Sequence, residues 1–166
     1  MDLELSRNPN FQNPLDAIEE IIFLKQWPCT RANDTELVSE IKGVHSLYRL
    51  YMVWSESIGA ISITITFDLK VPEQLKFQIF ELLSLINENL WMGHFDMTSK
   101  TGIPAYRNTY LIKDNNISNI KVIEDLVDIG IYDCEKFYPS FQMTLWENCK
   151  PTVALDTCML ETKGTA

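Results

Sequence analysis

The sequence lacks most features of nucleic-acid-binding, membrane-spanning and secreted proteins. Its 166 residues include 14 Lys and Arg against 23 Asp and Glu, which gives a formal net charge of −9. A chain this acidic repels phosphate groups, and no run of basic residues offsets the average, so we expect neither nucleic acid nor anionic membranes as partners. The longest apolar runs, such as 61–67, are far shorter than the roughly 20 residues that a membrane span needs.

Signals for export, metal binding and redox chemistry are also missing. The N-terminal sequence MDLELSRNPNFQNP has no basic region followed by an apolar one, which favours a cytoplasmic location. The cysteines at 29, 134, 149 and 158 form no Cys-x-x-Cys pair and have no histidine at the spacing of zinc ligands. We therefore expect no metal and no cofactor. Cys134 lies on the apolar side of a predicted helix and is interpreted as a buried, unreactive thiol.

The apolar residues that are present predict regular secondary structure in the first half of the chain. A helix capped by Asn13 is expected over 14–27, where Trp27 precedes a proline. A β-hairpin follows over 29–42. Strict alternation of apolar and polar residues then predicts two strands, over 45–54 and 60–69, each with one buried and one exposed face.

The second half predicts three helices and one pair of strands. A central helix is expected from Pro72 to about Gly93, followed by strands over 94–99 and 105–113. A long helix begins near residue 118, and Pro139 inside it is expected to kink or break it near 137–138. A short final helix is expected over 151–161.

The order of these elements, α-ββββ-α-ββ-α, favours an α+β fold: an antiparallel sheet with the helices packed on one face. We divide the chain into a flexible N-terminal arm (1–12), one α+β domain (13–148), and a C-terminal short helix with a polar tail (149–166). The length suits a single domain with a sizeable core.

The central helix carries more apolar surface than one contact would bury. Six of its apolar residues recur at steps of three and four and predict the core-facing side, expected to lie against the sheet: Leu75, Ile79, Leu82, Leu83, Ile86 and Leu90. Four others lie off that side: Phe77, Phe80, Leu85 and Trp91. An exposed patch of this kind is unusual in a monomer, so we predict that these four form a dimer or partner surface.

Several segments resemble the bacterial YbjN-domain family, whose members are described as sensory transduction regulators and are grouped by fold with type III secretion chaperones. They are NPLDAIEEI with the following WP, YRLYMVWSESIGAISITITFDLKVPE, ELLSLINENLWMGHFD and EDLVDIGIYDCEKFYPSFQMTLW. The resemblance runs from Asn13 over nearly the whole domain. It implies a chaperone-like fold that dimerises and assigns no catalytic residue. We therefore predict a non-enzymatic homodimer that binds an unidentified protein partner, as a chaperone-like or regulatory adaptor.

Two alternatives stay open. A hydrolase-like enzyme would use His94 with nearby carboxylates, among them Asp96, which strand alternation places on the same face, and Glu81 and Glu88 of the central helix. No nucleophile or metal partner accompanies them in the sequence. A small-ligand sensor would need an apolar cavity between the sheet and the central helix, which a sequence cannot reveal.

Overall fold

The structure is a computed structural model that describes residues 13–112 and 117–163. The predicted arm, 1–12, and the last residues of the predicted tail, 164–166, lie outside the described residues.

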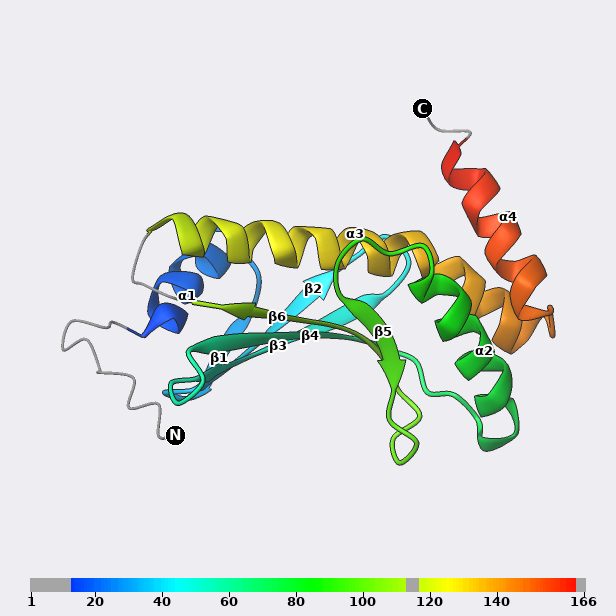
Figure 1. Cartoon of the computed structure of the whole chain (residues 1–166), viewed down its shortest axis with the longest axis horizontal. Coiled ribbons are helices and arrows are strands. Elements are labelled where there is room, and N and C mark those ends of the chain that lie inside the picture. The colour runs from blue at the N-terminus through cyan, green and yellow to red at the C-terminus, as the bar shows by residue number, and fades with distance from the viewer. Residues whose placement is uncertain (1–12, 113–116, 164–166) are drawn as a thin grey trace, which may run out of the picture.

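One antiparallel sheet of six strands forms the centre of the molecule, in the order β1-β2-β3-β4-β6-β5 (Figure 1). The strands are β1 (Cys29–Asn33), β2 (Glu36–Lys42), β3 (Leu47–Ser55), β4 (Ala60–Phe67), β5 (His94–Met97) and β6 (Pro104–Leu111). The first four form a meander of neighbouring hairpins, whereas β5 and β6 join it with β6 beside β4. The short strand β5 is therefore one edge of the sheet.

Two helices cover one face of this sheet, α1 (Pro14–Leu24) and α3 (Ile117–Trp146) (Figure 1). Two others, α2 (Lys76–Asn87) and α4 (Pro151–Lys163), lie at its β5 end beside the C-terminal part of α3, with a short 3₁₀ turn, η1 (Glu73–Leu75), before α2. The Asn13 side chain caps α1 by accepting a hydrogen bond from the Leu15 N–H at 3.0 Å. The predicted α+β class, the antiparallel sheet and the one-sided helical layer are confirmed.

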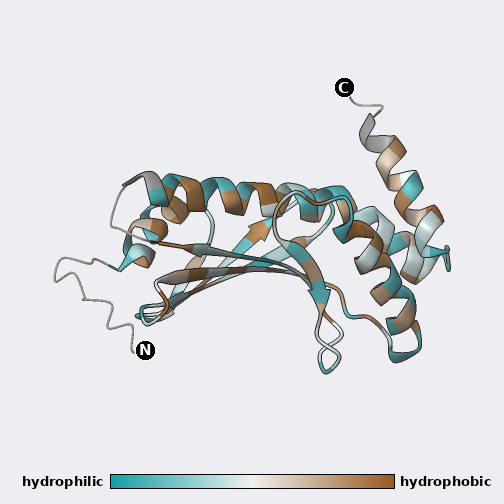
Figure 2. Cartoon of the chain, in the orientation of Figure 1, coloured by the Kyte–Doolittle hydropathy of each residue, from teal (hydrophilic) through white to brown (hydrophobic). Residues whose placement is uncertain are grey.

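The core lies between the sheet and its helices. Alternate residues of β3 and β4 face the core and are at most 5% exposed: Tyr48, Leu50, Met52, Trp54, Ile61, Ile63, Ile65 and Phe67. Apolar and polar bands recur along the ribbon of α3 (Figure 2). This pattern is typical of a helix with one apolar and one polar side. The opposite face of the sheet carries no helix among the described residues and stays open.

The central helix differs from its prediction in length and in what it contacts. It begins at Lys76 and ends at Asn87, so it is shorter than 72–93 at both ends. Its core-facing residues, such as Ile79 and Ile86, are buried at a contact with β5, α3 and α4 and do not lie across the sheet. The expectation that this side of the helix lies against the sheet is therefore wrong except at the edge strand β5. The physical reason is that α3 already covers the sheet.

The sequence predicts a kink or a break in α3 near Pro139, and the helix does not break. The helix continues from Ile117 to Trp146 through the proline. Phe137, Tyr138 and Phe141 around it are at most 5% exposed, so tertiary packing holds the helix together where one backbone hydrogen bond is missing. In Figure 1 the orange C-terminal part of α3 nevertheless leaves the line of its yellow part.

Candidate interaction surfaces

The predicted interaction residues lie at the end of the molecule formed by α2, α4 and the C-terminal part of α3 (Figure 1). Phe77 is 86% exposed, Phe80 39% and Trp91 100%. Leu85 is partly buried and packs against the core, so it offers less surface than the other three. Met92, which the sequence reasoning did not select, is 47% exposed beside Trp91. We call Phe77, Phe80, Trp91 and Met92 the α2 surface.

The α2 surface consists of two apolar groups at opposite ends of one helix. Phe77 and Phe80 lie one turn apart in the first turns of α2. Trp91 and Met92 follow the end of the helix. Ser84, which is exposed and small, lies seven residues from both Phe77 and Trp91. The helix rises about 1.5 Å per residue, so Phe77 is about 10 Å from Ser84 along the axis. Trp91 lies four residues past Asn87, where the helix ends, and is therefore reached through the turn that follows α2.

The residues of the enzyme alternative do not form a catalytic arrangement. Asp96 is held by Arg107, whose Nε donates to both carboxylate oxygens at 2.9 and 2.8 Å. The His94 side chain is exposed on β5 and has no hydrogen-bond or ion-pair partner among the described residues, while its backbone pairs with Arg107 in the sheet. A histidine that acts as a general base is usually oriented by a second group, and here the adjacent carboxylate is already engaged.

The Cys134 thiol is not accessible for chemistry. Cys134 is fully buried, and desolvation, with Asp133 and Glu135 nearby, raises the pKa of its thiol well above the ordinary value. The predicted burial of this residue is confirmed. Across the described ranges, no group of three or more His, Cys, Asp or Glu side chains could hold a metal ion.

A groove on the open face of the sheet was missed by the sequence reasoning. It has a volume of about 420 Å³, and its lining includes Arg49, Tyr51, Lys70, Ile103 and Arg107. We call it the sheet-face groove. Its residues come from three separate stretches of the chain, 47–51, 66–70 and 98–107, and the pairing of β4 with both β3 and β6 brings them together. The sequence signals were the outward positions of Arg49, Tyr51 and Arg107 in alternating strands.

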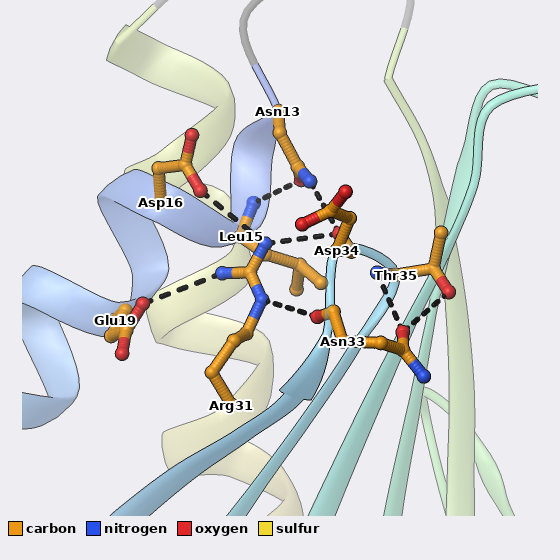
Figure 3. A network of polar contacts seen from close by, with 8 residues as sticks. All are labelled: Asn13, Leu15, Asp16, Glu19, Arg31, Asn33, Asp34 and Thr35. Carbon is orange, nitrogen blue, oxygen red and sulfur yellow. Dashed lines mark hydrogen bonds and ion pairs between the residues drawn. The ribbon is translucent and has the colours of Figure 1, made fainter.

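A polar network fastens α1 to the first hairpin (Figure 3). The Arg31 guanidinium on β1 donates to the backbone oxygens of Asn33 at 2.8 Å and Asp34 at 2.9 Å. It also pairs with Asp16 at 3.3 Å and Glu19 at 3.4 Å, both on α1. These contacts satisfy the arginine within the fold, so we interpret it as structural.

Comparisons with known proteins add one match. Neither the curated proteins nor the solved structures contain a match to this chain. The chaperone-like fold implied by the resemblance therefore stays a prediction. Within the part of the chain that the structure describes, no helix has both the length and the hydropathy to cross a membrane. The model of one family, described as "YbjN: Putative bacterial sensory transduction regulator", matches residues 14–143. The match covers α1, the whole sheet, α2 and most of α3, and the chain therefore belongs to the YbjN family.

Proposed function

We propose that this protein is a non-enzymatic regulatory adaptor of the bacterial cytoplasm that works as a homodimer and binds a further protein. Family membership supports the regulatory role, because the family is described as a sensory transduction regulator. The observation that carries the dimer is the arrangement of the α2 surface: two exposed apolar groups, one in the first turns of α2 and one just after its end, with the exposed Ser84 midway between Phe77 and Trp91 in the sequence.

This spacing suits a second copy of the same chain. A two-fold axis that crosses α2 at Ser84 places the two copies of the helix antiparallel, so that Phe77 of one protomer meets Trp91 of its partner. The same apolar contact then forms twice, once at each end of the helix pair. Ser84 at the crossing point is small enough for the two helix backbones to approach closely, whereas a large residue there would hold them apart.

The exposed area is sufficient for such an interface. A buried aromatic side chain removes about 150–250 Å² from water, so the α2 surface offers on the order of 600 Å² per protomer. A standard interface buries about 800 Å² per partner, which neighbouring residues of α2 would complete. Trp91 and Phe77 contribute most of this area and are the expected hot spots.

Analytical ultracentrifugation tests the dimer directly. We expect Phe77→Asp and Trp91→Asp to remain folded and to sediment as monomers at micromolar concentration. Val44→Asp is the matched control, because Val44 is 90% exposed on the loop before β3 and should leave the dimer intact. Ile86→Asp, which buries a charge at a fully buried position, should unfold the domain instead.

Cross-linking tests the position of the axis. In a chain with the partly exposed Cys29 and Cys149 replaced by serine, Ser84→Cys should form an intermolecular disulfide under mild oxidation. Gln74→Cys, ten residues from the axis, should not. A dimer that cross-links equally well at both positions, or a wild-type protein that sediments as a monomer, contradicts the proposal.

A further inference from the structure

The sheet-face groove is lined by three basic side chains, although the whole chain is acidic. Arg49, Lys70 and Arg107 line it, against the single acidic lining residue Asp68. The whole chain, in contrast, has 23 acidic and 14 basic residues. Asp96 pairs with Arg107 and Glu40 pairs with Arg49. The Lys70 ammonium and the N–H groups that these carboxylates leave free on the two arginines are the donors that the groove offers to an anion.

Arg107 is held in place for such a role. Its Nε is fixed by Asp96, and its Nη1 donates to the Thr64 hydroxyl at 3.3 Å. Its Nη2 has no hydrogen-bond partner among the described residues. A guanidinium anchored on one side presents its remaining N–H groups in a fixed geometry, which matches the oxygens of a carboxylate or phosphate group.

Arg49 is less restrained and lies across β4 from Arg107. In the sheet, Arg49 pairs with Thr66 of β4, and Thr64 of β4 pairs with Arg107 of β6. The nearest acidic partner of Arg49 is Glu40, at 3.5 Å, and the Arg49 side chain is 56% exposed. This arginine can therefore turn to a ligand without breaking a buried ion pair.

Hydrogen bonds hold one wall of the groove in a fixed position. The turn between β5 and β6 carries Thr101 and Ile103 of the lining. The Val71 N–H donates to the Gly102 carbonyl at 2.7 Å, and the Lys76 ammonium donates to the Ser99 carbonyl. These bonds fix the turn against the segment that follows β4, so the hollow exists before any ligand arrives.

We propose that the sheet-face groove binds a small organic anion, with its phosphate or carboxylate group held by Arg49, Lys70 and Arg107. Its apolar part lies against Tyr51 and Ile103. The volume of about 420 Å³ is within the usual range for small-molecule sites, about 300–1,000 Å³. The site does not rest on the proposed dimer, because none of its residues belongs to the α2 surface.

Titrations followed by ¹H–¹⁵N NMR test the site with three probes: inorganic phosphate, phenyl phosphate and benzoate. We expect saturable shifts confined to Arg49, Tyr51, Arg107 and the turn over 98–103. The aromatic probe with the preferred head group should bind more tightly than inorganic phosphate, since its ring adds apolar contact. Stronger binding of phenyl phosphate assigns a phosphate ligand, and stronger binding of benzoate assigns a carboxylate ligand.

Charge-removing variants distinguish specific binding in the groove from non-specific attraction of an anion to basic side chains elsewhere on the protein. Arg49→Gln should weaken the binding of the better aromatic probe about fivefold, and Arg49→Gln with Lys70→Gln should abolish saturation. Lys121→Gln makes the same change of charge on α3, across the sheet from the groove, and should leave binding unchanged. The proposal is overturned if no probe gives saturable shifts, or if Lys121→Gln weakens binding as much as Arg49→Gln does.

Discussion

Arg31 shows how one side chain can join two elements that are adjacent in sequence but packed in different layers. Its side chain is only 19% exposed, and it reaches both α1 and the turn between β1 and β2 (Figure 3). The Asn33 side chain supports the same turn by accepting hydrogen bonds from the Thr35 N–H and hydroxyl, each at 2.8 Å. Removing Arg31 therefore leaves backbone carbonyls without donors at the helix–hairpin junction.

Arg31→Met should lower the free energy of unfolding by about 1–2 kcal/mol, because charged hydrogen bonds at a mostly buried site are lost. Urea denaturation measures this change. The matched control is Arg49→Met, whose side chain is 56% exposed with one ion pair at 3.5 Å, and which should change stability by less than about 0.5 kcal/mol. Equal losses in the two variants would contradict the structural role assigned to Arg31.

The sheet-face groove shows what residue patterns in one sequence cannot reveal. Arg107 follows the alternation of β6 and is expected to face outward, but nothing in the sequence says that Asp96 and Thr64 hold it. Those contacts depend on which strands are neighbours, and β4 pairs with β6 instead of β5. The candidate site thus required the sheet order, which local periodicity does not encode.

At the scale of elements, the close approach of α3 to the sheet depends on Gly130. A Cβ atom there would lie 2.7 Å from Ile65 Cδ1 and 2.8 Å from Tyr106 Cε1, closer than van der Waals contact allows. Alanine is favoured over glycine by about 1 kcal/mol inside a helix. The steric conflict with Ile65 and Tyr106 disfavours alanine at the same position. A substitution at Gly130 therefore shows whether helix propensity or tertiary packing has the larger effect on stability.

We expect Gly130→Ala to destabilise the protein by about 1–2 kcal/mol in spite of its better helix propensity, because an overpacked core typically loses about 1–3 kcal/mol. Thermal or urea denaturation gives the value. Ile65→Val removes the methyl group nearest to the new Cβ, so the double variant should lose less than the sum of the two single losses. If the losses in the free energy of unfolding were strictly additive, the new Cβ at position 130 and the Ile65 side chain would not be in steric conflict.

Most elements were predictable because their local signals agree with the fold, and α2 was the exception. The capped start of α1 and the alternation in β3 and β4 are decided within a few residues of sequence. The partners of α2 are decided by α4, which begins at Pro151 and packs against both α2 and α3. Apolar residues on α2 were recognised, but a sequence cannot say that a helix about 65 residues away covers some of them.

At the scale of the whole molecule, the two proposed surfaces serve different partners. The sheet-face groove lies on the open face of the sheet, and the α2 surface lies on the helical end. A ligand in the groove contacts the turn between β5 and β6, which Lys76 at the start of α2 holds through Ser99. This hydrogen bond joins the first residue of α2 to the turn that lines the groove.

The net charge of −9 predicts how the dimer responds to salt. Two acidic protomers repel each other, and the proposed axis brings the exposed Glu88 of one protomer near Phe80 and Glu81 of its partner. Raising the ionic strength from about 0.01 M to about 0.1 M shortens the Debye length from about 30 Å to about 10 Å and screens this repulsion. The dissociation constant of the dimer should therefore fall as salt is added.

Sedimentation equilibrium over a series of salt concentrations measures this dependence. Glu88→Gln should tighten the dimer at low salt and flatten its salt dependence, because it removes a like charge near the crossing point. Glu20→Gln on α1 makes the same change of charge at an exposed position away from α2 and should shift the curve less. A dimer that weakens with salt would instead be held by ion pairs between opposite charges, and the apolar α2 surface would then not be its interface.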